Sequence, residues 1–175
     1  MKQLVTNLIR TGVLETKEIT DAFLHVDRKN FVLSEYEDEA YGDYPLPIGY
    51  GQTISQPTTV AMMLEWLQPK KGEKILDVGS GSGWTTALLA DIVGPAGKVF
   101  GVEIVPELVA FGQKNLDKSN CPKANILQAG EKLGLPQEAP FDRILVSAAG
   151  REIPKELVDQ LKIGGTMVIP VGSSI

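Results

Sequence analysis

The sequence predicts an α/β fold, with a doubly wound, Rossmann-like parallel sheet preceded by helices. Three observations support this prediction. Short apolar runs alternate with amphipathic stretches after residue 72, the first run leads into a glycine-rich turn at Gly79–Gly83, and residues 1–33 show helical spacing. Strand–helix repeats of this length are typical of a parallel sheet with helices on both faces.

The first 33 residues are expected to form helices. Apolar residues recur at helical spacing over Leu4–Ile9 and again over Ile19–Val26, with a break at Gly12. Thr16 is the expected N-cap of the second helix. His25 lies near the end of that helix, where a cation stabilises the helix dipole, so its position has a structural explanation.

A segment rich in glycine, proline and tyrosine follows, over Tyr41–Gln56. It has little periodicity, and a loop of this length inside a domain is usually functional or disordered. Its apolar and aromatic content argues against disorder. An amphipathic helix is then expected over Val60–Leu67, ending before Pro69.

The rest of the chain alternates between strands and helices. The expected strands are Lys74–Val78, Val99–Val102, Ala124–Gln128, Arg143–Ser147 and Thr166–Val171, the last entered through Gly164-Gly165. The expected helices are Trp84–Val93, Pro106–Leu116 and Pro154–Leu161.

The glycine turn and a later acid predict a site for an adenosine-bearing ligand. Gly79, Gly81 and Gly83 let a backbone approach a ligand, and Glu103, 20 residues beyond Gly83, ends the next strand and can accept hydrogen bonds from ribose hydroxyls. Such a turn can also be purely structural. The flanking strand, the helix and Glu103 favour the ligand site.

The spacing favours S-adenosylmethionine over a dinucleotide. A dinucleotide fold requires Gly-x-Gly-x-x-Gly to seat a pyrophosphate, but here Trp84 follows three alternating glycines and Asp77 precedes them. An acid at that position repels phosphate and suits a cationic ligand. Because ligands bind at the carboxyl ends of parallel strands, Ala129-Gly130-Glu131 is expected beside the same site.

Composition excludes several other functions. The 175 residues suit one domain, and a net charge of −5 argues against a nucleic-acid groove. No apolar run resembles a membrane span or signal peptide. With one cysteine and one histidine, a metal site and Ser-His-Asp hydrolysis are not expected, and the cysteine count fits the reducing cytoplasm.

Two segments together closely resemble the protein-L-isoaspartate O-methyltransferases. They are Pro45–Pro57, read as Pro-Leu-Pro-Ile-Gly-x-Gly-Gln-Thr-Ile-Ser-Gln-Pro, and Asp77–Gly83. Supporting matches lie at Val26-Asp27-Arg28, Phe31-Val32, Tyr41-Gly42-Asp43, Phe141–Val146, Ile153-Pro154, Gln160–Lys162, Gly164-Gly165 and Ile169–Gly172. The first segment is the specific one, because glycine turns occur across methyltransferases.

The resemblance implies a class I methyltransferase domain over 1–175, with helices and a covering loop in 1–70 and a cofactor-binding core in 71–175. It implies methyl transfer from S-adenosylmethionine, leaving S-adenosylhomocysteine, to the free carboxylate of L-isoaspartyl residues in damaged proteins, which initiates repair. The residues implied in cofactor binding are Thr53, Ile54, Ser55, Asp77, Gly79, Ser80, Gly81, Glu103, Ile104, Gly130 and Glu131.

Ser55 matches the serine that the family treats as its active-site residue. The resemblance implies that it orients the attacking carboxylate by a hydrogen bond. The residue type alone is equally compatible with a cap of the helix that begins near Gln56-Pro57, and both roles are open at this point.

Two departures from the family pattern matter. Ala129-Gly130-Glu131 stands where the family usually has Gly-Asp-Gly, so the acid expected at the adenine amino group is displaced or lost, and weaker cofactor binding is expected. The sequence also stops at Ile175, where the family continues through antiparallel strands. Strand 166–171 is therefore expected at an open sheet edge, where the chain could self-associate or a longer parent would cover it.

Two alternatives to the repair enzyme stay open. One is a catalytically weak or inactive S-adenosylmethionine-binding module, and the other is a methyltransferase for a dedicated peptide partner. Cofactor binding without methyl transfer to an isoaspartyl peptide would indicate the module.

Overall fold

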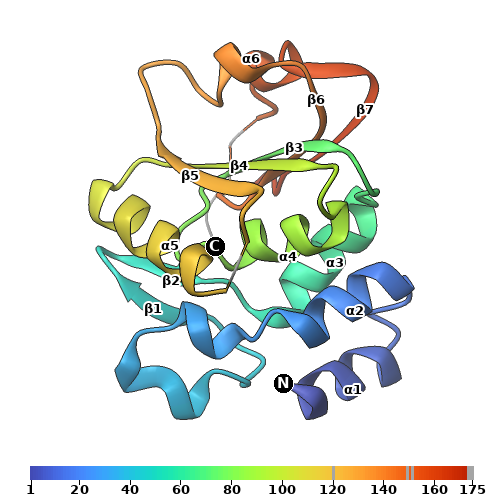
Figure 1. Ribbon diagram of the computed structural model, residues 1–175, viewed down its shortest axis with the longest axis vertical. Coiled ribbons are helices and arrows are strands. Elements are labelled where there is room, and N and C mark those ends of the chain that lie inside the picture. Colours follow the sequence, from blue (N-terminus) through green and yellow to red (C-terminus); the bar gives the residue numbers. More distant parts are fainter. Residues whose placement is uncertain (120, 149, 151, 173–175) are drawn as a thin grey trace.

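The computed structural model describes residues 1–119, 121–148, 150 and 152–172 (Figure 1). At its centre lies a parallel sheet formed by β3 (Lys74–Val78), β4 (Lys98–Glu103), β5 (Ala124–Gln128), β6 (Phe141–Val146) and β7 (Leu161–Val168). The strand order is β5-β4-β3-β6-β7. The chain therefore leaves β3 toward one edge and later returns to place β6 on its other side, which opens a crevice at the carboxyl end of β3.

The N-terminal helices lie on one side of the sheet together with the crossover helices. These are α1 (Lys2–Arg10), α2 (Lys17–His25), α3 (Pro57–Leu67), α4 (Trp84–Val93) and α5 (Pro106–Lys118). Thr16 occupies the N-cap position of α2 but does not cap it. Its hydroxyl instead donates to Glu65 Oε2 of α3 at 2.6 Å, so it joins two helices.

The opposite face of the sheet is covered by two short helices, η3 (Pro136–Glu138) and α6 (Lys155–Val158) (Figure 1). The expected helix over Pro154–Leu161 is therefore wrong in length. The chain enters β7 at Leu161, and the buried side chain of Gln160 donates to Leu133 O and accepts from Leu135 N. These contacts hold the covering segment on the sheet.

Alternation along the strands fills a core on each face. Ile75 and Val99 pack with the helices, whereas Leu76 and Phe100 pack on the opposite face with Leu157. Fully burying each such side chain stabilises the fold by roughly 1.5–3 kcal/mol. The N-terminal helices share the first cluster with the sheet, so they form one continuous core with it.

The segment over Tyr41–Gln56, which the sequence predicts as a loop, contains a β-hairpin. Its strands are β1 (Leu46–Gly49) and β2 (Gln52–Ile54), which pair antiparallel. Tyr50 and Gly51 have φ of 55° and 70° at the turn. Two residues with positive φ are what a tight hairpin requires. Before the hairpin lie η1 (Arg28–Phe31) and η2 (Ser34–Glu39).

β7 lies at the sheet edge, as expected, with different bounds. Its regular pairing with β6 begins at Thr166, after an irregularity that contains Gly164, and ends at Val168. Val171 makes only an isolated bridge to Gly150. Within the described residues β7 pairs on one side only, and no antiparallel strand joins this sheet.

Across the described ranges, no helix has the length and apolar character needed to cross a membrane. The longest, α5, has 13 residues.

Candidate functional site

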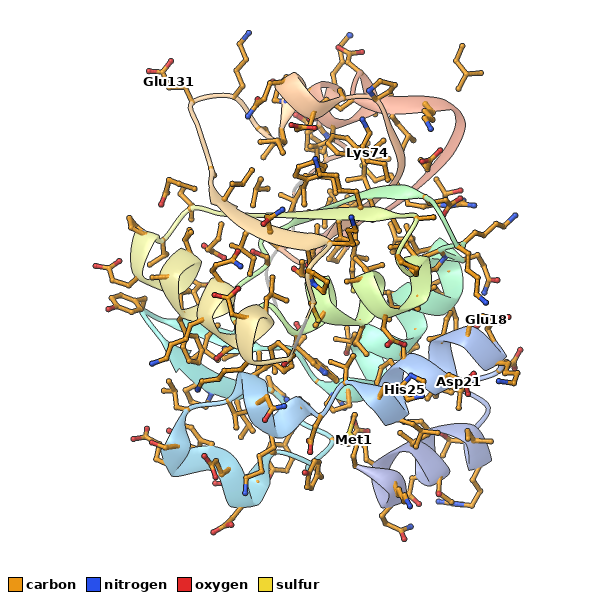
Figure 2. The ribbon with its side chains drawn as sticks, viewed as in Figure 1. Met1, Glu18, Asp21, His25, Lys74 and Glu131 are labelled. Atoms are coloured by element: carbon orange, nitrogen blue, oxygen red, sulfur yellow. The ribbon has the colours of Figure 1, made fainter. Side chains whose placement is uncertain are left out.

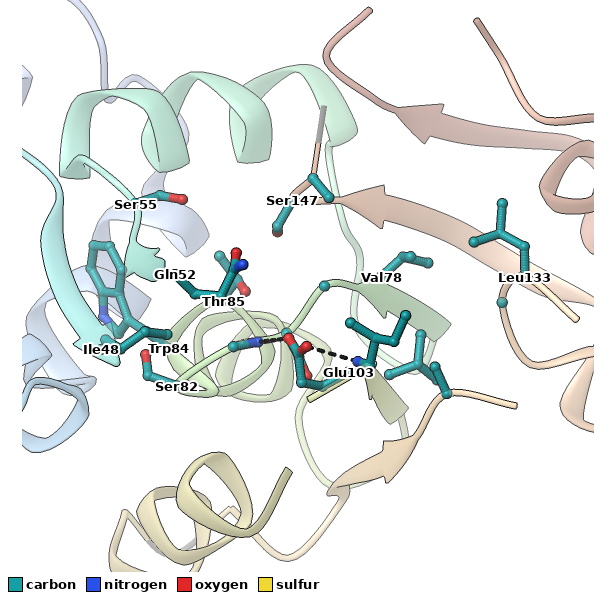
Figure 3. Close-up of a pocket in the computed structure, with 18 of the residues that line it drawn as sticks. Ile48, Gln52, Ser55, Val78, Ser82, Trp84, Thr85, Glu103, Leu133 and Ser147 are labelled. Carbon is teal, nitrogen blue, oxygen red and sulfur yellow. Dashed lines mark hydrogen bonds between the residues drawn. The ribbon is translucent and has the colours of Figure 1, made fainter. Parts of the chain in front are cut away.

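A cavity of about 570 Å³ lies over the carboxyl ends of β3, β4 and β6 (Figure 3). Its walls are the hairpin (Ile48, Gln52–Ser55), the glycine turn and start of α4 (Val78–Ser82, Trp84, Thr85), the end of β4 (Val102–Ile104), the segment after β5 (Ala129–Gly134), and Ser147 and Ala148. This volume is typical of small-molecule sites.

The structure brings all but one of the sequence-predicted site residues to this cavity. Those that line it are Thr53, Ile54, Ser55, Gly79, Ser80, Gly81, Glu103, Ile104, Gly130 and Glu131. They come from four separate segments, so their convergence depends on the strand order. Their individual binding roles stay predictions.

Asp77 is the exception, because it lies beneath the cavity wall. It is fully buried, and its Oδ2 accepts hydrogen bonds from the hydroxyls of Thr85 and Thr86, both at 2.7 Å, while Oδ1 accepts one from Ser147 at 3.3 Å. Burial raises the pKa of this carboxyl. Thr85 and Ser147, which sequence reasoning missed, line the cavity in its place.

The glycine turn is packed tightly against α5. Gly79, Gly81 and Gly83 all have positive φ, which side chains rarely adopt. From the helix, the Asn115 side chain donates to Ser82 O at 3.0 Å, and a Cβ at Gly112 would lie 2.7 Å from Gly81 O. The turn is therefore fixed from behind by residues that are distant in sequence.

Glu103 is anchored at the tip of β4 by three backbone amides. Its Oε2 accepts from Gly81 N at 3.0 Å, and its Oε1 accepts from Ile104 N at 2.7 Å (Figure 3). The same Oε1 also accepts from Val105 N at 3.0 Å. The side chain is only 6% exposed yet lines the cavity. Each carboxylate oxygen can accept more than one hydrogen bond, so capacity remains for a ligand hydroxyl.

Ser55 faces the cavity and does not cap α3. The N-cap residue is Gln56, which makes no side-chain capping bond. Asp43 instead caps the helix from a distance, accepting from Thr58 N at 2.9 Å and from the Thr58 hydroxyl at 2.6 Å. The Ser55 hydroxyl has no hydrogen-bond partner in the described part of the chain and lines the cavity, so the capping explanation is wrong.

The hairpin folds over the glycine turn. A Cβ at Gly81 would lie 3.2 Å from Cδ1 of Ile48, which shows how close the two segments are. Within the hairpin, Ile54 is buried and Thr53 is exposed. In Figure 3, Ser55 and Leu133 lie on opposite sides of the view, with Glu103 and Ser147 between them.

Residues 130–133, in the cavity wall that follows β5, are exposed. Gly130 is exposed, and a Cβ built there would meet nothing within 4 Å. The Glu131 side chain projects away from the body of the molecule (Figure 2). Lys132 and Leu133, which the sequence interpretation did not single out, complete this wall.

His25 lies on α2 and does not line the cavity (Figure 2). Its Nδ1 lies 3.2 Å from Asp91 Oδ2 on α4, so it joins two helices. Among the residues with described positions, no group of three or more His, Cys, Asp or Glu side chains is arranged to hold a metal ion.

The parallel sheet, the glycine turn and the acid at the next strand tip define a class I methyltransferase fold. The crystal structure of a protein-L-isoaspartate O-methyltransferase from Plasmodium falciparum, in complex with S-adenosyl-L-homocysteine, superposes with a TM-score of 0.87 at 30% identity. The alignment covers 98% of this chain and 84% of that one.

The chain belongs to the protein-L-isoaspartate (D-aspartate) O-methyltransferase family, whose model matches residues 1–175. Protein-L-isoaspartate O-methyltransferases from Aeropyrum pernix and Methanopyrus kandleri are 47% and 46% identical to it, each over 98% of the chain. The chain spans 66% and 76% of the length of these two relatives.

Proposed function

We propose that this chain transfers the methyl group of S-adenosylmethionine to the free carboxylate of L-isoaspartyl residues in damaged proteins or peptides, which initiates their repair. The observation that carries the proposal is the position of Ser55. The Ser55 hydroxyl belongs to the family's specific motif, has no hydrogen-bond partner among the described residues, and lies in the same cavity as the glycine turn and Glu103. The donor and acceptor of a methyl group must meet in such a cavity.

The residues present fit the methyl donor. Gly79 and Gly81 have no side chains, so the backbone of the turn is open to a nucleoside at these two positions, and the Glu103 carboxylate suits ribose hydroxyls. S-adenosylmethionine supplies an electrophilic methyl group when bound, and an ionised carboxylate that displaces the neutral thioether gives a methyl ester and S-adenosylhomocysteine. A carboxylate with a pKa of about 4 needs no general base at pH 7.

The chain's own residues then act by positioning and by excluding water. The Ser55 hydroxyl orients the substrate carboxylate, and Thr53 and Ile54 of the hairpin close over the cavity. Gly79, Ser80 and Gly81 form its floor.

A paired-peptide assay tests this function. An isoaspartyl peptide, and the same peptide with a normal aspartyl residue, are incubated with labelled S-adenosylmethionine. Label on the isoaspartyl peptide alone supports the proposal, and no label on either overturns it. Cofactor binding by calorimetry without transfer to any peptide would indicate a binding module, whereas transfer to one particular peptide irrespective of its linkage would indicate a dedicated partner.

Damaged proteins are thus the proposed partners, and a second copy of the chain is another. Among the described residues, β7 pairs on one side only, and backbone groups on its other side can pair with another strand, so we propose self-association through the edge over 166–171. We also propose a cytoplasmic setting, because the single cysteine, Cys121, fits a reducing compartment.

A further inference from the structure

Arg28 is a buried cation whose hydrogen-bond partners, within the described part of the chain, are all backbone carbonyls. Its side chain is fully buried at the start of η1, and no carboxylate lies within ion-pair distance of it among the described residues. Its Nη1 donates to the carbonyl oxygens of Ala40 at 2.8 Å and Gly42 at 3.3 Å. Its Nη2 donates to those of Tyr44 and Ser55, both at 3.1 Å.

The same guanidinium lies over Trp84, which lines the cavity. The Arg28 Cζ atom is 5.2 Å from the ring centroid, within the range of a cation–π interaction. Trp84 is 1% exposed and packs edge-on against Phe23, with centroids 5.5 Å apart. One side chain therefore joins the first residue of α4 to the backbone of Ser55.

Asp27, the residue before Arg28, also contacts the segment over 40–44. The Asp27 carboxylate accepts a hydrogen bond from the Tyr41 hydroxyl at 3.0 Å, and it also accepts one from Lys29 N at 3.1 Å. The adjacent pair Asp27-Arg28 thus anchors the segment over 40–44 at both its side chains and its carbonyls.

We propose that Arg28 is a positioning residue for the substrate carboxylate, which fixes the Ser55 backbone and the segment over 40–44 against Trp84. This inference rests on the proposed methyl transfer, whose acceptor is an anion. The carbonyl oxygens satisfy guanidinium donors, and the Asp43 carboxylate in the same segment favours the charged form of Arg28.

The cost of burying this cation makes a purely space-filling role a poor explanation. An arginine without an ionic partner is expensive to desolvate, and an apolar side chain would fill the same volume more cheaply. Burial lowers the pKa of Arg28 to about 10, so the group still carries its charge at pH 7. The planar fork also reaches four carbonyls at once, which a lysine ammonium with three donors cannot do.

The test compares Arg28→Lys with Phe141→Leu. Phe141 lies at the amino end of β6, away from the cavity, and controls for lost stability. For Arg28→Lys we expect the KM for an isoaspartyl peptide to rise about tenfold or more, and S-adenosylhomocysteine affinity to stay within about threefold. Hydrogen exchange over 40–56 should accelerate in Arg28→Lys only.

A folded Arg28→Lys protein with wild-type KM and wild-type hydrogen exchange would overturn the proposal. An equal rise in KM and in exchange over 40–56 in Phe141→Leu would overturn it as well. If Arg28→Lys does not fold, Tyr41→Phe decides, because it removes an exposed tie on the same segment. Tyr41→Phe should raise both the KM for the peptide and the rate of hydrogen exchange over 40–56. If neither changes, the proposal that this segment is anchored for substrate binding is overturned. A wild type without methyl transfer refutes the proposed function separately, while the exchange measurement still tests the anchor.

Discussion

Gly112 of α5 packs directly against Gly81 of the glycine turn. A Cβ at position 112 would lie 2.7 Å from the Gly81 carbonyl oxygen and 2.6 Å from Ile126 Cδ1. Neither neighbour can move freely, because one is backbone and the other belongs to a buried strand. The close packing of this helix therefore sets the floor of the cavity.

Gly112→Ala should consequently push the turn out of place. Overpacking of this kind costs about 1–3 kcal/mol, more than the roughly 1 kcal/mol that alanine gains in a helix. We expect weaker S-adenosylhomocysteine binding by calorimetry together with a lower melting temperature. Lys114→Ala, on the exposed side of the same helix, is the control. Unchanged affinity in Gly112→Ala would mean that the turn tolerates displacement.

Glu103→Ala should weaken cofactor binding strongly. Loss of a charge-assisted hydrogen bond costs about 1.5–3 kcal/mol, and the three amides bound to Glu103 would lose their acceptor as well. Glu103→Gln should also bind poorly, because its NH₂ group would face backbone donors. Glu107→Ala removes the same charge from an exposed position nearby. Calorimetry showing wild-type affinity in Glu103→Ala would refute the ribose assignment.

Ser55→Ala should reduce methyl transfer and leave both stability and cofactor affinity intact. A hydrogen bond to a charged group contributes about 1.5–3 kcal/mol, which corresponds to a loss of roughly 10- to 150-fold in kcat/KM. The hydroxyl caps no helix, so the melting temperature should not change. Asp43→Ala, which removes the observed cap of α3, should lower it by the equivalent of about 1 kcal/mol. Equal turnover by Ser55→Ala would remove Ser55 from the mechanism.

Gly130→Asp should tighten S-adenosylhomocysteine binding. The position is exposed, its φ is not positive, and a Cβ there meets nothing within 4 Å, so the substitution is sterically free. An acid at this wall can accept a hydrogen bond from the adenine amino group. Gly130→Asn keeps the size without the charge. If neither variant binds S-adenosylhomocysteine more tightly and Glu131→Gln binds it more weakly, then Glu131 accepts the hydrogen bond from adenine instead.

The open side of β7 should cause concentration-dependent association. Ile163 is fully exposed on this strand, and a charge on an edge strand discourages pairing. Ile163→Lys should therefore shift the sedimentation profile toward monomer, while Ile153→Lys, off the strand, should not. A wild type that stays monomeric at high concentration would refute the association.

Local sequence patterns predicted most strands of the sheet. They predicted few of the long-range contacts that fix the site residues in place. The bounds of Lys74–Val78, Trp84–Val93 and Ala124–Gln128 are those of β3, α4 and β5, because each is a periodic run ended by glycine or polar residues. The short α6 escaped prediction because its end depends on where β7 pairs and on Gln160, which binds a segment some 25 residues earlier.

The convergence of the site residues could also be predicted, because strand ends meet at one edge of a parallel sheet. The orientation of Asp77 could in principle have been read from strand alternation, since Ile75 and Asp77 point to the helix side. The roles of Gly112 and Arg28 could not, because each depends on backbone atoms that lie far away in the sequence.

The buried position of Asp77 has a consequence for the kind of ligand atom that can approach the cavity floor. A hydroxyl has one proton, and Thr85 and Ser147 both direct theirs to the Asp77 carboxylate. Only their lone pairs are left for the cavity. At Thr85 and Ser147 the cavity therefore presents hydrogen-bond acceptors, which pair with an incoming ammonium or other donor.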